Sequence, residues 1–359
     1  MTAGIDYPLT TAALYEHLKV RLSGVVPEFE LLAKAEIAVE INRLKKEKNA
    51  IILGHNYMEP ALFHSVPDYT GDSLYLSRVS AQTRAHMIVF CGVRFMAETA
   101  KILNPSRTVL LPSAKGGCSL AASITAEDVR RIKAKYSGLP VVTYVNCYAD
   151  VKAESDYCCT SGNAAEVVEK LRQLGHEQIA FLPDEYLARN TAHQIDMPVV
   201  IEDLGTLDQP VHTNWKAGQP LMVGWRGRCE VHEQFTVEDI TNARKQFPGV
   251  VVLAHPECSP DVIKASDFSG STTQMLRHVE QTEKGRLLLL TECSMGDNIA
   301  AQNPNREILR TCSIRCPHMG EITLEETWEA LKQVRYVIDV PSDISVRAHQ
   351  ALQRMISIG

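Results

Sequence analysis

The sequence lacks the features that mark several large classes of protein. Its 37 Lys and Arg residues do not outnumber its 43 Asp and Glu residues, and the net charge is −6. A basic face for nonspecific nucleic-acid binding is therefore not expected. No apolar run reaches the ~18 residues that a membrane-spanning helix needs, and the first residues show no secretory leader. We expect a cytoplasmic protein with neither a nucleic-acid nor a membrane partner.

What is present is ordinary for a folded chain. The 359 residues are 45% hydrophobic and 22% charged, which excludes a disordered or collagen-like protein. At ~150 residues per domain, the length allows two or three domains.

Cysteine is the unusual component, with ten residues. No two of them are spaced as a CxxC pair, so the sequence does not indicate a zinc ribbon or a ferredoxin. A disulfide scaffold is not expected in a reducing compartment. Most of the cysteines are interpreted as small buried hydrophobic residues, unless a subset recurs in a pattern.

A threefold repeat supplies such a pattern. Three apolar runs, typical of buried parallel strands, each end in a polar turn. The runs span 51–53, 141–144 and 250–253, and the turns span 54–57, 145–146 and 254–257. Each unit continues with a hydroxyl-rich turn that opens a helix, at 71–73, 160–163 and 270–273. A further strand follows in each, at 87–90, 178–182 and 286–290.

Each unit closes on a cysteine in a polar turn, at Cys118, Cys229 and the segment 312–316. Alternating strands and helices predict parallel sheets with helices on both faces. We therefore predict an α/β protein of three similar three-layer αβα domains around a pseudo-threefold axis, with the active site at the centre. The predicted divisions are a helical extension at 1–45, a first domain at 46–117 plus 317–359, a second at 118–228 and a third at 229–316.

Such a centre would combine two kinds of chemistry. Three thiolates suit zinc or an iron–sulfur cluster, and a cluster held by three cysteines keeps one iron open for a Lewis-acid role. Helix N-termini with hydroxyls favour carboxylate or phosphate. Titratable side chains at the strand ends are suited to proton transfer. Taken singly, each of these residues also fits a structural role. A hydroxyl can be an N-cap residue, a histidine can be a hydrogen-bonded structural residue, and a tyrosine can be a packing residue.

Several segments, in this order along the chain, resemble quinolinate synthase. They include Gly54-His55-Asn56-Tyr57, Gly71-Asp72-Ser73-Leu74, the stretch 91–101, Gly117-Cys118-Ser119, Tyr144-Val145-Asn146, Thr160-Ser161, Cys229-Glu230-Val231-His232, His255-Pro256-Glu257-Cys258 and Gly270-Ser271-Thr272. The resemblance runs from about Ile51 to the C-terminus.

The resemblance implies three αβα domains around a pseudo-threefold axis and one [4Fe–4S] cluster per chain. It implies condensation of iminosuccinate with dihydroxyacetone phosphate to quinolinate, with loss of phosphate and two waters, in de novo NAD biosynthesis. An aspartate oxidase or dehydrogenase would be a partner that supplies the imine.

The resemblance also implies roles for single residues. The cluster ligands would be Cys118, Cys229 and Cys316, with Cys312 either a spare thiol or a disulfide partner of Cys316 on oxidation. Tyr57 and Glu257 would be an acid–base pair, and His232 would line the site as a further catalytic residue. The substrate-binding residues would be His55, Ser73, Tyr144, Asn146, Ser161, His255, Glu257, Ser271 and Thr272.

Two other functions stay open. Three cysteines could hold a labile cluster in an iron or oxygen sensor, although no helix-turn-helix or other output module is visible. The same α/β frame could instead carry a zinc-dependent aldolase or hydrolase.

Overall fold

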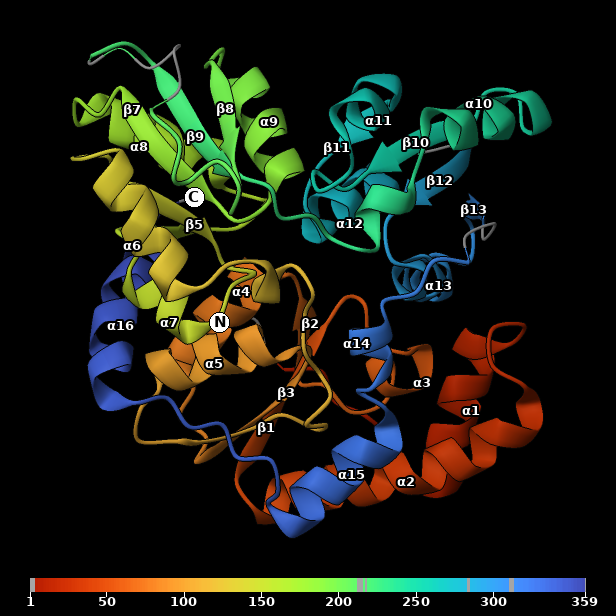
Figure 1. Ribbon diagram of the computed structural model, residues 1–359. Helices are drawn as coiled ribbons and strands as arrows, with labels where there is room; N and C mark the ends of the chain where they lie inside the picture. The colour runs from red at the N-terminus through yellow and green to blue at the C-terminus, as the bar shows by residue number, and fades with distance from the viewer. Residues whose placement is uncertain (1–3, 212–215, 217, 283–284, 310–312, 359) are drawn as a thin grey trace.

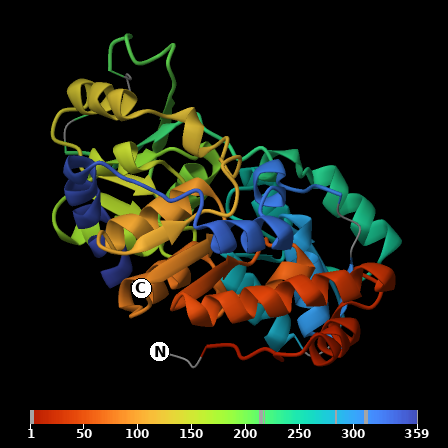
Figure 2. The ribbon, with the colours of Figure 1, turned by 90° about the horizontal axis from the view of Figure 1, so that it is seen from below.

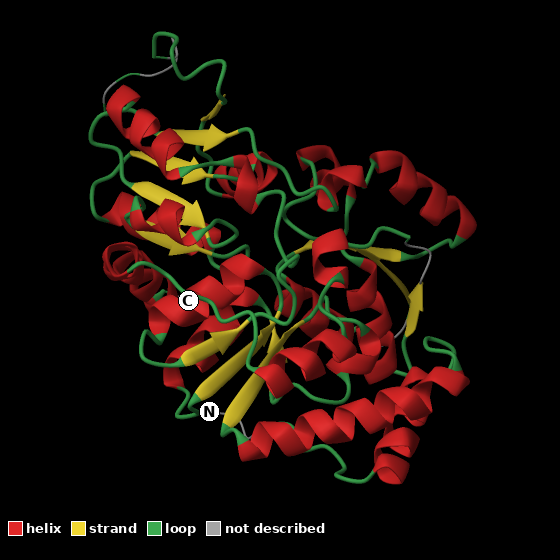
Figure 3. Cartoon of the chain, turned by 60° about the horizontal axis from the view of Figure 1, so that its bottom comes forward, coloured by secondary structure: helices red, strands yellow, loops and turns green. Residues whose placement is uncertain are grey.

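The computed structural model describes residues 4–211, 216, 218–282, 285–309 and 313–358. Its strands form three separate sheets, and every strand pair within them is parallel. Figures 1 and 3 show the three groups of strands with helices around them. The predicted three-unit α/β architecture is confirmed.

The first sheet has the strand order β2-β1-β3-β4. The short helix after β1 begins with Pro60 and buries all of its residues, which anchors the chain directly behind the first polar turn. The elements of this unit are β1 (Ala50–His55), α3 (Pro60–Phe63), β2 (Tyr69–Gly71), α4 (Ser73–Gln82), β3 (Met87–Cys91), α5 (Arg94–Leu103) and β4 (Thr108–Leu110).

The second sheet repeats this arrangement and adds one edge strand, giving the order β6-β5-β7-β9-β8. Its strands are apolar because helices cover the sheet, and every residue of β5 and β9 is buried. The elements are α6 (Ala126–Lys135), β5 (Val141–Tyr144), α7 (Ala149–Ala153), β6 (Tyr157–Cys159), α8 (Ala164–Gln173), β7 (Gln178–Leu182), α9 (Glu185–Gln194), β8 (Val199–Glu202) and β9 (Leu221–Trp225).

The third sheet has the order β11-β10-β12-β13, which matches the first sheet strand for strand. The elements are α10 (Val237–Gln246), β10 (Val251–Ala254), α11 (Pro260–Ala265), β11 (Phe268–Ser269), α12 (Thr272–Gln281), β12 (Arg286–Leu290), α13 (Cys293–Gln302) and β13 (Glu307–Leu309). The strand runs predicted from the sequence all lie in or overlap the observed strands, and the predicted helix after residue 163 is α8.

An aspartate just before the second strand joins it to the first strand in each unit. Asp68 receives a hydrogen bond from the backbone N–H of Ile52 at 2.7 Å. Asp156 and Asp267 make the same bond at 2.8 Å. In all three the aspartate N–H also donates to the carbonyl of the strand before it. The threefold repeat therefore extends to side chains that the sequence analysis did not single out.

The helices that lead into the second and third sheets also begin alike. Thr125 and Asp128 form a capping box at the start of α6, and Thr236 and Asp239 form one at the start of α10. In a capping box the two side chains satisfy each other's free backbone N–H groups. The same local sequence therefore starts the same helix in both units.

Helices from the two ends of the chain complete the molecule. α15 (Leu324–Gln333) lies beside α2 (Glu28–Glu47), as Figure 2 shows, and α1 (Thr11–Leu22) also packs on α2. After the short α14 (Pro317–Gly320) and α15, the chain crosses to α16 (Ser342–Ser357), which packs on α7, β6 and α5. The C-terminal segment therefore joins the first unit to the second.

Candidate active site

Loops from all three units converge on one cavity of about 70 Å³. In a parallel sheet all strands end at the same edge, where ligands usually bind. Every side chain that the sequence analysis selected for a metal, a substrate or catalysis lines this cavity. They are His55, Tyr57, Ser73, Cys118, Tyr144, Asn146, Ser161, Cys229, His232, His255, Glu257, Ser271, Thr272 and Cys316. The structure brings this set together, while the role of each residue stays a prediction.

Glu257 is in contact with two histidines inside the cavity. Its Oε2 atom lies 2.6 Å from Nδ1 of His232 and 3.7 Å from Nδ1 of His255. The shorter contact is an ion-pair distance rather than an aligned hydrogen bond, because Nδ1 of His232 meets no hydrogen-bond geometry. All three residues are at most 4% exposed. A carboxylate between imidazoles and shielded from water is suited to moving protons.

The charges of this group follow from burial and from each other. Burial alone would raise the pKa of Glu257, but the adjacent His232 and His255 outweigh it, so this pKa is lowered. Burial lowers the pKa of His55 to about 4, only partly offset by Asp72 and Glu257. At neutral pH the cavity therefore holds an ionised Glu257 beside a neutral His55 imidazole.

Two side chains of the second unit hold the other side of Glu257. Nδ2 of Asn146 donates to Oε1 of Glu257 at 3.1 Å. Burial, and then the charge of Glu257, raises the pKa of Tyr144 well above its ordinary value, so its hydroxyl keeps its proton. A residue of the third unit is thus oriented by the loop that follows β5.

Tyr57 brings a phenol from the first unit to the same place. Its hydroxyl lies 2.6 Å from Oγ1 of Thr291 and 3.5 Å from Nε2 of His232. Nε2 of His232 is also 3.0 Å from Oγ1 of Thr291. Burial, and then the charge of Glu257, raises the pKa of Tyr57 well above its ordinary value. Tyr57 is therefore a neutral proton donor within a chain of polar groups that ends at Glu257.

The hydroxyl-rich turns line the cavity at the starts of helices. Ser271 is the N-cap of α12, and its hydroxyl donates to Oδ2 of Asp72, the N-cap of α4, at 3.2 Å. Ser161 lies 3.3 Å from Nε2 of His255. Nδ2 of Asn56 donates to Oγ1 of Thr272 at 2.9 Å. Helix N-termini and hydroxyls of this kind favour an anion.

The three predicted cysteine ligands approach the cavity from three chain segments. Cys118 follows β4, Cys229 follows β9 and Cys316 follows β13, and all three are free thiols. The turn before Cys229 depends on Gly227, where an added Cβ would lie 2.5 Å from the carbonyl oxygen of Pro183. Close packing therefore fixes the approach of this cysteine.

Burial keeps the three thiols protonated in the absence of a cation. Burial raises the pKa of Cys118 to about 12 and that of Cys316 to about 11, and it raises the pKa of Cys229 well above its ordinary value. Thiolates at such positions need a cation to stabilise them, and a soft metal centre is one. One ligand atom each from Cys229, His232 and Glu257 also lies within 4.8 Å of the others.

Two further cysteines bear on the prediction of a disulfide at Cys316. Cys312 lies outside the described residues, so its predicted alternatives stay open. Cys316 is free in the structure. Cys293, at the start of α13, is disulfide-bonded, which differs from the expectation that the cysteines are reduced.

Several groups that line or support the cavity are not among the predicted site residues. Thr291 joins Tyr57 to His232, and Glu292 lines the cavity with its pKa raised by burial to about 7. Both directly follow β12, so the rule that strand ends carry functional side chains would have selected them. Phe95 and Met96, which lie in the stretch 91–101, form part of the apolar wall.

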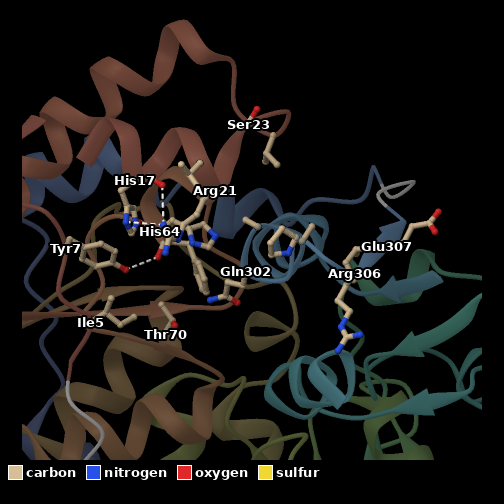
Figure 4. Close-up of a pocket in the computed structure, with 17 residues that line it drawn as sticks. Ile5, Tyr7, His17, Arg21, Ser23, His64, Thr70, Gln302, Arg306 and Glu307 are labelled. Atoms are coloured by element: carbon tan, nitrogen blue, oxygen red, sulfur yellow. Dashed lines mark hydrogen bonds between the residues drawn. The ribbon is translucent and has the colours of Figure 1, made fainter. Parts of the chain in front are cut away.

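A second and larger cavity, of about 770 Å³, lies between the N-terminal segment, the first unit and the third unit. Figure 4 shows His17, Arg21 and His64 together in it. Its polar groups bind one another: Arg21 contacts Nδ1 of His17 at 3.1 Å, and Nε2 of His17 lies 3.1 Å from the carbonyl oxygen of His64. Arg306 donates to the carbonyl of Glu280. None of the predicted site residues lines this cavity.

Helices of the described residues give no sign of a membrane span, because none of them has both the length and the apolar character to cross a bilayer.

Comparison with known proteins identifies relatives over almost the whole chain. The model of the family described as quinolinate synthetase A protein matches residues 39–357. Quinolinate synthase 2 of Mesorhizobium japonicum is 48% identical over 97% of this chain and 98% of its own length. The quinolinate synthase of Caulobacter vibrioides is 45% identical over 97% of this chain and 88% of its own. The quinolinate synthase of Agrobacterium fabrum is 45% identical over 99% of this chain and 94% of its own length.

Proposed function

The chain belongs to the quinolinate synthetase A protein family, which is a family of enzymes, and from this premise we propose that it is a quinolinate synthase of de novo NAD biosynthesis. It would condense iminosuccinate with dihydroxyacetone phosphate and release phosphate and two waters. The two substrates together supply all the atoms of quinolinate and of these leaving groups, so no oxidant is needed. The observation that carries the proposal is the convergence of every predicted site residue on one cavity.

We propose that Cys118, Cys229 and Cys316 hold one [4Fe–4S] cluster per chain. Their fit to such a group rests on three soft donors that face one cavity and that burial keeps from ionising without a cation. When bound, the cluster would supply an open iron that acts as a Lewis acid toward a leaving oxygen.

The anionic substrates would lie on the hydroxyl side of the cavity. Ser161 and Ser271, with the N-termini of helices such as α12, offer donors to carboxylate and phosphate. His55 is buried and neutral, so it can donate one hydrogen bond without adding charge. The remaining substrate-binding residues would be Ser73, Tyr144, Asn146, His255, Glu257 and Thr272.

Proton transfers would depend on Glu257, His232 and Tyr57. Glu257 is ionised and can accept a proton from carbon, while the neutral phenol of Tyr57 can donate one to oxygen. His232 lies between them, 2.6 Å from Oε2 of Glu257 and 3.5 Å from the hydroxyl of Tyr57. A small rotation of the His232 ring would align Nδ1 with Oε2 of Glu257, and the chain would then let the pair exchange protons without bulk water.

The finer assignments follow from the same proposal. We place the domain boundaries at the predicted ranges, since each sheet lies inside one of them. We propose a cytoplasmic location and an aspartate oxidase or dehydrogenase as the source of the imine, because iminosuccinate hydrolyses in water.

An oxygen-free assay tests the function. Purified protein mixed with iminosuccinate and dihydroxyacetone phosphate should form quinolinate and release phosphate, and iron and acid-labile sulfide should be present in equal amounts. Iron and sulfide without quinolinate would favour the sensor. A colourless zinc protein without quinolinate would favour the zinc-dependent aldolase or hydrolase.

A further inference from the structure

Helices of one unit form hydrogen bonds with the active-site loops of the next unit, in a closed cycle. In α13 of the third unit, Nδ2 of Asn298 donates to the carbonyl oxygens of Asn56 and Met58 in the first unit, at 3.2 and 2.9 Å. In α9 of the second unit, Nδ2 of Asn190 donates to the carbonyls of Pro256 and Cys258 in the third, at 2.8 and 2.9 Å.

The third link of the cycle uses a carboxylate. Oε2 of Glu98, in α5 of the first unit, accepts from the N–H of Ala149 in the second unit at 2.9 Å. Oε1 of Glu98 pairs with Arg94 at 2.7 Å, which fixes the carboxylate. The loop that it holds carries Asn146, the residue that donates to Glu257.

The two asparagines occupy equivalent places in the fold. Each is the sixth residue of the helix that follows the third strand of its unit in the chain, α9 after β7 and α13 after β12. Each uses both N–H groups of its amide on two carbonyls that are two residues apart. The residue between those carbonyls is Tyr57 for Asn298 and Glu257 for Asn190. Each asparagine therefore brackets one member of the proposed acid–base pair.

From this juxtaposition we infer that Asn190 and Asn298 are positioning residues that set the places of Glu257 and Tyr57 for proton transfer. The inference rests on the proposed function of that pair. A main chain held on both sides of one residue keeps the Cα–Cβ bond of that residue in place, and a shift of about 1 Å can lower a rate roughly a hundredfold. Each asparagine and the loop that it holds come from different units. Glu257 and Tyr57 are therefore aligned only when the units are docked.

Asn298 is placed to hold this loop. The residue is 1% exposed, and its Nδ2 atom donates to two carbonyls of the loop that carries Tyr57. Buried hydrogen bonds of this kind fix the path of a loop.

The test compares Asn298→Ala, Asn298→Asp and Asn190→Ala with Asn303→Ala. Asp keeps the size of Asn but loses the N–H donors. Asn303 caps the same helix, and among the described residues its Nδ2 donates within that helix, to Ile299. We expect kcat to fall by about 10- to 100-fold in the first three variants, with KM changed less than about threefold, iron content kept, and Asn303→Ala within about twofold of the wild type.

Hydrogen exchange gives a readout that does not depend on the reaction. Asn298→Ala should raise exchange in peptides covering 55–58, and Asn190→Ala in peptides covering 255–258, with no change in Asn303→Ala. Unchanged kcat and unchanged exchange in folded Asn298→Ala and Asn190→Ala would overturn the inference, as would failure of all three variants to fold. An inactive wild type with the expected exchange pattern would instead overturn the proposed function alone.

Discussion

The carboxylate of Glu257 and the imidazole of His232 meet at 2.6 Å in the centre of the molecule, and neither residue is more than 2% exposed. They come from different segments of the third unit, since His232 begins η2 (His232–Gln234) after β9 and Glu257 lies in the loop after β10. Low exposure strengthens their interaction, because little water is present to screen it. The pair is therefore the electrostatic centre on which the proposed proton transfers depend.

Glu257→Gln should remove the base while keeping the shape of the side chain. We expect kcat for quinolinate formation to fall by about 10²- to 10⁴-fold, with iron content unchanged, in an oxygen-free steady-state assay. Glu233→Gln is the matched control, since Glu233 is exposed and next to His232 in the chain. Equal activity of the two variants would remove Glu257 from the mechanism.

Tyr57→Phe should remove the proposed acid with little change in packing. The expected loss in kcat is again about 10²- to 10⁴-fold. Tyr7→Phe serves as the control, because the hydroxyl of Tyr7 donates to the carbonyl of Phe63 in the second cavity. A Tyr57→Phe enzyme with a full cluster and wild-type turnover would show that the phenol is dispensable.

Thr291→Val should weaken the link between Tyr57 and His232 without changing side-chain volume. A lost hydrogen bond of about 1 kcal/mol corresponds to roughly a fivefold decrease in kcat. Thr241→Val is the control, since its hydroxyl bonds only to the preceding turn of α10. If both variants turn over at the same rate, Thr291 has no part in the reaction.

Cys118→Ala, Cys229→Ala and Cys316→Ala should each lose most of the iron and sulfide, because a cluster with two remaining thiolates is not held. Cys158→Ala is the control: Cys158 is fully buried and free but lies away from the cavity. The measurement is metal and sulfide analysis beside the visible absorption spectrum. Full iron content in any of the first three variants would exclude that cysteine as a ligand.

The free energy of unfolding should decrease as the pH falls, because His64, which lies outside the active site, takes up a proton on unfolding. Burial, with Arg21 and His17 adding repulsion, lowers the pKa of His64 to about 3. The unfolded chain, with its ordinary pKa of about 6.5, therefore binds the proton first as pH falls. The free energy of unfolding should drop by about 1.4 kcal/mol per pH unit between these values for this one group.

Urea unfolding at about pH 7 and about pH 5 measures this effect. His64→Asn should show a shallower decrease than the wild type, whereas His193→Asn, at an exposed position, should not. The same decrease in all three proteins would mean that His64 is already protonated in the folded state.

The fold was largely predictable because its signals are local. Apolar runs such as 141–144 and 286–290 are strands in the structure, since a strand covered on both faces must be apolar along its whole length. Repetition of strand, turn and helix then predicted three parallel units. The equivalent aspartates Asp68, Asp156 and Asp267 were not selected, because their partners are strand N–H groups 15 or 16 residues away.

The site was predictable as a set of residues but not as a set of contacts. Tyr57 and Glu257 were predicted from their places at strand ends and from the family resemblance. Neither source indicates which residues connect the two. Asn298 enters only through hydrogen bonds to residues more than 200 positions away. No periodicity in a sequence records pairings of that separation.

By itself, the sequence determined the three parallel units, the order of the cysteine turns and the kinds of side chain at each strand end, because hydrophobic period and turn chemistry act over a few residues. Only the tertiary structure decided that these ends face one cavity, that His232 contacts Glu257, and that each unit holds a loop of the next. Those relations depend on how preformed units dock, and docking is set by shape and buried polar groups across the whole chain.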